Sequence, residues 1–227
     1  MRFARTMAVV LWVCCLVSPG IAFAVTYGQI DTFEDGSTQD WTVALGGFGP
    51  HPAPPQNIST GGPAGADDNF LLLTAIGGNG PGSRLTVINP AQWGGNYLAA
   101  GVTAISMDVK NLGFSDLALR LLFEDPVGGP PTNVAVSTNS ILVPAGSDWI
   151  TVAFPITALD LTALEGDVTA ALTNATETRL FHNLAAGFPG SAVVSQLGVD
   201  NIAAVPAPPA ALLLTTGLAG LWFLRRK

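Results

Sequence analysis

The sequence predicts an all-β fold of antiparallel strands. The chain has 227 residues, of which 26 are Gly and 17 are Pro. Its apolar runs are short, and turn residues interrupt them often, which favours strands over long helices. Several runs also alternate apolar with polar residues, the period of two that is typical of a strand with one buried face.

The N-terminus has the features of a secretory signal peptide. Two arginines precede an apolar run from Met7 to Val17, and a Pro-Gly break follows it. Ala22 and Ala24 then form the small-x-small pattern of a signal-peptidase site, so we expect residues 1–24 to be removed. Both cysteines lie inside this segment, so the exported chain would have neither a disulfide nor a cysteine metal site.

The body that follows is strongly acidic and has the length of one domain, which we place at residues 25–204. Its cations are only Arg84, Lys110, Arg120 and Arg179, against all 16 acids of the chain, so its charge is 4 − 16 = −12. Binding to nucleic acid needs clustered cations, and this composition excludes it. The acidity fits a soluble extracellular protein and also one that holds a divalent cation.

The first half of the body predicts three strands and a long loop. Val25 to Ile30 is the first strand, and Gly46 to Ala66, dense in Gly and Pro, is the loop. Phe70 to Ile76 is an apolar run of strand length. Arg84 to Ile88 follows after a Gly-rich turn, so the two runs are expected to form a hairpin.

The clearest alternation comes in the middle of the chain. Val102 to Lys110 and Leu117 to Glu124 both show it, and the short turn from Asn111 to Asp116 between them predicts an antiparallel pair. Trp149 to Phe154 repeats the pattern, with Ile150, Val152 and Phe154 on one face.

The last part combines short helical turns with two more strands. The spacing of two apolar sets predicts one or two helical caps: Leu159, Ala163 and Leu164, then Val168, Ala171 and Leu172. Strands are expected at Thr178 to Asn183 and at Ser191 to Ala203.

Acidic residues near both ends of the body are candidate metal ligands. Asp31, Glu34 and Asp35 lie within five residues of one another before a turn glycine, and such carboxylates can supply oxygen ligands to Ca²⁺. A solvated acidic turn explains the same residues equally well. Asp200 interrupts the apolar last strand, where a buried carboxylate is costly unless it is paired or coordinated.

Three aromatic residues are candidates for sugar binding. Trp93 and Tyr97 lie among glycines, and Trp149 opens an alternating strand. Exposed aromatic rings stack against sugars, whereas buried ones fill the core, and the sequence leaves both interpretations open.

Sequence motifs of the common enzyme classes are missing from the chain. There is no His-Glu-x-x-His site, no Gly-x-Ser-x-Gly elbow and no phosphate-binding glycine loop followed by Lys. Glu124 and Asp125 would form a poor glycosidase pair, because adjacent residues on a strand point to opposite faces. We therefore expect a protein without enzymatic activity.

The two ends of the body resemble a known fold group. The opening Asp31-Thr32-Phe33-Glu34-Asp35-Gly36 and the closing Leu197-Gly198-Val199-Asp200-Asn201-Ile202 are similar to the ends of jelly-roll β-sandwiches of the carbohydrate-binding-module and galactose-binding type. The segment from Trp149 to Arg179 also resembles the laminin domain IV pattern. The resemblance implies an antiparallel jelly-roll sandwich with short helical caps. It also implies that the first and last strands meet, with a structural Ca²⁺ held first by Glu34 and Asp200, and with Asp31 and Asp35 as secondary candidates.

The C-terminus resembles the PEP-CTERM sorting signal. Val205, Pro206 and Pro208 precede an uncharged run from Ala210 to Leu224, and Arg225, Arg226 and Lys227 end the chain. As a helix the run would span about 22 Å, short of a hydrocarbon core of about 30 Å. The terminal cations place the C-terminus in the cytoplasm.

This resemblance implies an exported protein that is held at the inner membrane by residues 205–227 until an exosortase processes it. The protein would then pass to the cell surface or an extracellular polysaccharide matrix. Ala207 stands where the family usually has Glu, and a plain transmembrane anchor is the alternative interpretation.

Three functions fit these observations. The first is a non-enzymatic surface or matrix protein, associated with exopolysaccharide through its sorting route. The second is a carbohydrate-binding, lectin-like module with Trp93, Tyr97 or Trp149 as its platform. The third is a glycan-acting hydrolase. The sequence supports the first best, because it requires only the targeting signals and the fold.

Overall fold

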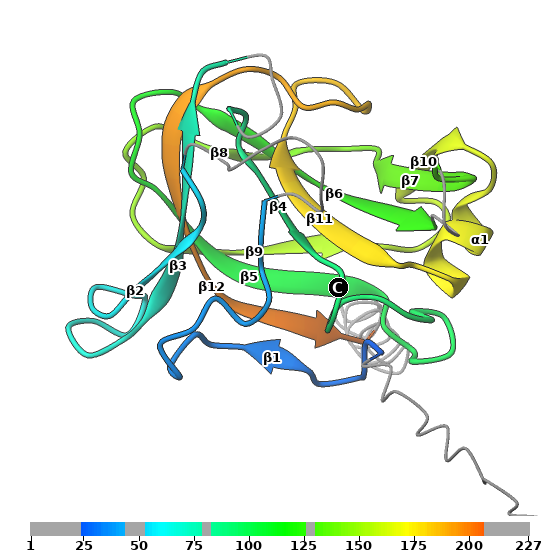
Figure 1. The fold of residues 1–227 in the computed structure, drawn as a ribbon, viewed down its shortest axis with the longest axis horizontal. Coiled ribbons are helices and arrows are strands. Elements are labelled where there is room, and N and C mark those ends of the chain that lie inside the picture. The colour runs from blue at the N-terminus through cyan, green and yellow to red at the C-terminus, as the bar shows by residue number, and fades with distance from the viewer. Residues whose placement is uncertain (1–23, 44–52, 79–82, 126–129, 207–227) are drawn as a thin grey trace, which may run out of the picture.

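The protein folds as an all-β, antiparallel jelly-roll sandwich of two six-stranded sheets (Figure 1). This description comes from a computed structural model, and it covers residues 24–43, 53–78, 83–125 and 130–206. The predicted fold class is therefore confirmed. Most of the predicted signal peptide and of the predicted sorting tail lies outside the described residues. Among those residues, no helix is both long and apolar enough to cross a membrane.

The first sheet, sheet A, is organised around the last strand of the chain. That strand pairs with β3 on one side and β5 on the other, and it also pairs with the short first strand. Across the sheet, the strands are β2 (Gln56–Ile58), β3 (Phe70–Ile76), β12 (Val194–Val205), β5 (Ala104–Asn111) and β9 (Ile150–Pro155), with β1 (Ile30–Asp31) beside β12.

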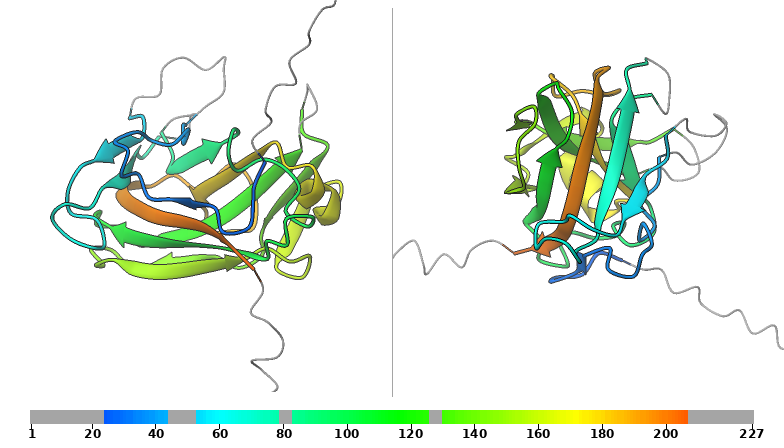
Figure 2. Two further views of the ribbon diagram at one scale, coloured as in Figure 1. Left: turned by 90° about the horizontal axis from the view of Figure 1, so that it is seen from below. Right: turned by 90° about the vertical axis from the view of Figure 1, so that its left-hand side faces the viewer.

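The second sheet, sheet B, packs against sheet A (Figure 2). Its order is β10 (Leu161–Glu165), β7 (Asn133–Ser137), β6 (Leu117–Asp125), β11 (Glu177–His182) and β4 (Thr86–Asn89), with β8 (Ile141–Val143) also paired to β6. Its outer edge at β4 is extended by an antiparallel bridge between Thr42 and Ile88.

The core lies between the sheets and is built from the alternate residues that face inward. From sheet A it takes Ile105, Met107 and Val109 of β5, as the alternation predicts. Sheet B contributes the second set, Leu117, Leu119, Leu121 and Phe123 of β6. A smaller cluster of Leu122, Val134, Val136 and Phe181 lies on the outer face of sheet B.

Two predicted strand pairings are wrong, although the strands themselves are present. β3 and β4 do not form a hairpin, and β5 and β6 do not pair, because in both cases the two strands belong to different sheets. The side chain of Asn111 holds the second crossing, since its Nδ2 donates to Ser115 O at 2.9 Å and to Val143 O at 3.0 Å. The short connection after Asn111 therefore crosses from sheet A to sheet B instead of joining two neighbouring strands of one sheet.

One predicted helical turn is a strand, and the other is a helix. Leu161–Glu165 forms β10 and pairs with β7, so the helical spacing of Leu159, Ala163 and Leu164 is misleading. The second set lies on α1 (Val168–Thr173), where Asp167 caps the N-terminus by accepting from Ala170 N. Its Ala171 and Leu172 are buried and join the core.

Candidate functional site

The predicted contact between the first and last strands is present, and it positions Asp31. β1 pairs with β12 through Ile30↔Ala203 and Asp31↔Ile202. The Asp31 side chain points into the core, where its Oδ2 accepts the indole N–H groups of Trp41 and Trp93, both at 2.7 Å. Burial raises the pKa of this carboxyl, and the two indole hydrogen bonds oppose the rise. Asp31 is thus engaged inside the sandwich, and its predicted role as a metal ligand is not supported.

The other three predicted metal ligands also do not form one cluster. Asp35 lies on an exposed turn, where hydrogen bonds from the backbone and hydroxyl of Ser37 lower its pKa. Glu34 is exposed and accepts a hydrogen bond from Asn69 N at 2.9 Å. The charge of Glu34 adds to the rise in the pKa of Asp200, so these two carboxylates lie near each other. The acidic turn and the acid of the last strand therefore meet, but with two of the four residues facing elsewhere.

Asp200 lies at an irregularity of β12, on the outer face of sheet A. The pairing of β12 with β5 shifts register between Asp200 and Ala203, and Asn201 there has a left-handed backbone with φ of 50°. Burial raises the pKa of Asp200 to about 7, and the nearby charges of Asp68, Asp108 and Glu34 add to the rise. In the described part of the chain, however, no three His, Cys, Asp or Glu side chains are grouped so that they could hold a metal ion.

The predicted sugar platform does not form around Trp93 and Tyr97. Both side chains are fully buried in the core, so neither ring can stack against a ligand. The Tyr97 hydroxyl lies between Trp93 O and Thr178 Oγ1, at 2.8 and 2.6 Å. Burial raises the pKa of Tyr97. This part of the prediction is corrected: the glycines around these residues allow close packing of the loop, not exposure.

Trp149 differs, because its ring lies on the outer face of sheet A and is only half-buried. Its indole N–H donates to Gly61 O at 3.0 Å, and its ring meets Phe70 edge-on at a centroid distance of 5.4 Å. It passes over Gly198, where an added Cβ would lie 2.8 Å from the ring. Trp149 is the one predicted aromatic residue that a ligand could still reach.

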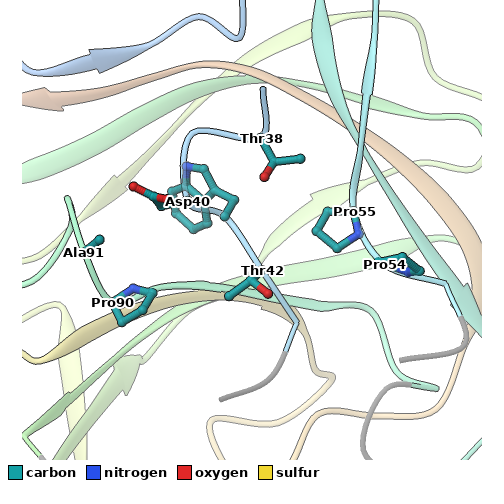
Figure 3. Close-up of a pocket in the computed structure, with 8 residues that line it drawn as sticks. Thr38, Asp40, Thr42, Pro54, Pro55, Pro90 and Ala91 are labelled. Atoms are coloured by element: carbon teal, nitrogen blue, oxygen red, sulfur yellow. The ribbon is translucent and has the colours of Figure 1, made fainter. Parts of the chain in front are cut away.

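A cleft lies at the β4 edge of sheet B, and its side chains come from three segments (Figure 3). Its volume is about 440 Å³, within the range of small-molecule sites. One segment supplies the polar groups, and the other two supply mostly proline rings. The lining residues are Thr38, Asp40, Trp41 and Thr42, then Pro54 and Pro55, then Pro90 and Ala91.

The polar segment of the cleft is held in an unusual backbone conformation. Gln39 and Asp40 both lie in the left-handed region, with φ of 47° and 61°. Asn89 Nδ2 fixes this turn by donating to Gln39 O at 2.9 Å, and Thr42 N donates to Ile88 O at 2.8 Å. Such conformations cost free energy and are concentrated at functional sites. The sequence signal, a Gln-Asp-Trp turn without glycine, is too weak to predict the cleft.

A charged cluster on the outer face of sheet B was also not predicted. Arg179 Nη2 donates to Glu124 Oε1 at 3.2 Å and to Glu177 Oε1 at 2.6 Å, and Glu124 and Glu177 are directly opposite on neighbouring strands. Burial raises the pKa of Glu124, Glu177 adds to the rise and Arg179 opposes it. The Arg179 guanidinium also lies 4.7 Å from the centre of the Phe188 ring. Glu177 and Arg179 are two residues apart on β11, whereas Glu124 is 55 residues from Arg179, and the sheet register brings it to them.

Known structures share this fold at low sequence identity. The family 11 carbohydrate-binding module from Clostridium thermocellum, solved with a β-1,3-1,4-mixed-linked tetrasaccharide, is similar with a TM-score of 0.50 and 16% identity, over 81% of this chain and 98% of that chain. An exo-β-agarase is similar with a TM-score of 0.54 and 15% identity, over 81% of this chain and 25% of the enzyme. No model of a known protein family matches the sequence. No curated protein matches it either.

Proposed function

We propose that the protein is a carbohydrate-binding module, exported to the cell surface or extracellular matrix and without catalytic activity of its own. The observation that carries this proposal is the cleft at the β4 edge, where Thr38, Asp40 and Thr42 lie between proline rings. Hydroxyl and carboxylate groups bind sugar hydroxyls, while the flat apolar sides of the prolines suit the C–H faces of a sugar ring.

The fold supports the same choice over a purely structural matrix protein. It is shared with a module that was solved in complex with a tetrasaccharide and with a quarter of an enzyme that acts on agar. Association with exopolysaccharide would then follow from direct binding as well as from the sorting route. A glycan-acting hydrolase is the weaker alternative, because Glu124 and Asp125 have different partners, Arg179 and Asn133.

The export route is part of the proposal and rests on the sequence. Signal peptidase would cleave after Ala24, and an exosortase would recognise the tail that begins at Val205 and Pro206. β12 ends at Val205, so the tail starts where the last strand of the sandwich stops. The inner membrane, through the C-terminal helix, is the proposed intermediate location.

Binding should depend on Asp40. We expect Asp40→Asn to weaken retention of the protein in native gels that contain mixed-linked β-glucan or agarose, by about tenfold in affinity, because a charged hydrogen-bond partner is lost. Asp40 is exposed, and its carboxylate accepts no hydrogen bond from the described residues, so the fold should keep its stability. Asp148→Asn is the matched control, since Asp148 is exposed and pairs with Lys110 on sheet A.

Trp149→Ala distinguishes two candidate binding sites, the cleft and the half-buried tryptophan on sheet A. Loss of retention in Trp149→Ala with normal retention in Asp40→Asn would move the site to the outer face of sheet A. Unchanged retention in both variants would contradict both sites. Release of reducing sugar from either polysaccharide by the purified body would instead favour the hydrolase.

A further inference from the structure

Among the described residues, most of the buried polar atoms that lack a hydrogen-bond partner lie on or beside the outer face of sheet B. Four buried side-chain nitrogen or oxygen atoms have no hydrogen-bond partner among the described residues: Arg84 Nε, Thr86 Oγ1, Asp125 Oδ1 and Arg179 Nε. A buried polar group without a partner typically costs about 1–3 kcal/mol, so a concentration of them in one place needs an explanation.

The strand register places Thr86 and Arg179 on one face of sheet B. Thr86 lies directly opposite Phe181, and Ile88 directly opposite Arg179, so these four side chains share the outer face of sheet B. Arg84 lies two residues before Thr86, in the bend that leads into β4. Arg84, Thr86 and Arg179 therefore present two guanidinium N–H donors and one hydroxyl along β4 and β11.

This row continues the cleft. Thr42 and Ile88 exchange two backbone hydrogen bonds, of 2.8 and 2.7 Å, so the Thr42 side chain lies on the same face as Ile88. Thr86 is two residues further along the strand, a distance of about 7 Å. A ligand that fills the cleft beside Thr42 needs only one further unit to reach Thr86.

The three residues are only half-buried as a whole, although their unpaired atoms are covered. Binding through the Thr86 hydroxyl requires a change of its side-chain rotamer, because the oxygen is covered. Phe188 lies over the guanidinium of Arg179, and this residue is 51% exposed. The three residues thus lie partly at the surface, beside their covered polar atoms.

We propose that Arg84, Thr86 and Arg179 form a second carbohydrate subsite, and that the ligand is an uncharged oligosaccharide running from the edge cleft along β4. Sugar hydroxyl and ring oxygens would accept the hydrogen bonds that these donors do not make within the protein. An anionic sugar is disfavoured, because Glu124 and Glu177 already share the Arg179 guanidinium. The subsite rests on the proposed function, since it extends the same binding site.

Thr86→Val tests the subsite, because it removes the unpaired hydroxyl and keeps the shape of the side chain. We expect the variant to unfold at a higher urea concentration than the wild type and yet to bind mixed-linked β-glucan or agarose about tenfold more weakly in native gels. A residue with a purely structural role would not move stability and affinity in opposite directions.

Thr162→Val is the matched control. Thr162 lies on β10 of the same sheet, and its hydroxyl is already paired with Thr138 Oγ1 at 2.9 Å. This variant should keep the wild-type affinity and should not gain stability.

The outcomes distinguish this subsite from the cleft. Weaker binding by Asp40→Asn together with unchanged binding by Thr86→Val leaves the proposed function intact and overturns the subsite. A loss of stability in Thr86→Val also overturns it, because the hydroxyl would then have a structural partner. Tighter binding to the anionic polysaccharide alginate than to the neutral ones overturns the uncharged ligand. If none of the three polysaccharides, mixed-linked β-glucan, agarose and alginate, retains the wild type, the proposed function and the subsite are overturned together.

Discussion

Asp31 holds two of the three tryptophans of the predicted body. Its Oδ2 atom accepts from the indoles of Trp41 and Trp93, whose ring centres are 6.0 Å apart. Trp41 lines the cleft, and Trp93 O accepts the hydroxyls of Tyr97 and Thr178. One buried carboxylate on the first strand therefore connects the cleft to the strand contacts of sheet B.

Replacing this carboxylate should destabilise the fold. Asp31→Ala leaves two buried indole N–H donors without acceptors, so we expect it to lower the free energy of unfolding by about 3 kcal/mol. Urea unfolding followed by tryptophan fluorescence measures this loss. Asp31→Asn should lose less, because its amide oxygen still accepts.

The matched control for this prediction is Asp35→Ala. Asp35 is exposed, and its carboxylate accepts hydrogen bonds from the backbone and hydroxyl of Ser37, so the change should lower stability far less than Asp31→Ala does. Equal stability losses in Asp31→Ala and Asp35→Ala would show that the indole hydrogen bonds contribute little.

At the scale of elements, β12 combines a long regular strand with one irregularity. It passes between β3 and β5, and its register shifts at Asp200 and Asn201. Asn is one of the residues that tolerate a left-handed backbone, and the Asp200 carboxylate accepts from Asn201 N at 2.7 Å. An Asp-Asn pair inside an apolar strand is thus explained by a local turn of the backbone, which periodicity alone does not indicate.

This irregularity should make stability depend on pH. The pKa of Asp200 is raised to about 7 from 3.8, so the native state holds a proton that the unfolded state has lost between these values. The contribution of Asp200 to stability is therefore favourable at low pH and is lost as pH rises from about 4 to about 7.

Asp200→Asn should remove that dependence, because the amide does not titrate. Its oxygen can still accept from Asn201 N, so the local backbone should be kept. At pH 8 we expect the variant to be more stable than the wild type by about 2 kcal/mol, roughly half of what the full shift implies, because the amide carries no charge that the fold has to bury. Below about pH 4 the two should unfold alike. Urea unfolding across the pH range measures the difference, and parallel curves would contradict the pKa shift.

Calcium binding by Glu34 and Asp200 remains a prediction that the same proteins can test. If a cation neutralises these carboxylates, Ca²⁺ should raise the melting temperature of the wild type at pH 8, and EDTA should reverse the effect. Asp200→Asn should respond to neither. A wild-type melting temperature that is insensitive to both would contradict a structural calcium.

At the scale of the whole molecule, the sequence predicts the strands better than their partners. Alternation correctly identifies β5, β6 and β9, because the pattern depends only on which face of a strand is buried. Pairing depends on loops that cross between layers, as after Asn111, and no local pattern shows this.

The candidate site was hidden for the same reason. The partners of Trp93 and Tyr97 lie 62 and 81 residues away in sequence, at Asp31 and Thr178, so their burial is set by distant contacts. The edge cleft is likewise assembled from three separate segments.

The export route can be tested on the whole protein in its native cells. Gly28 N donates to Ala204 O at 3.1 Å, so the chain enters the sandwich beside the point where the tail leaves it, and the tail should be accessible for processing. We expect the body to appear at the surface or in the medium, shortened by the tail, only in cells with an active exosortase. Fractionation with an antibody and mass spectrometry would measure this. A full-length protein in the inner membrane of both strains would identify the tail as a plain anchor.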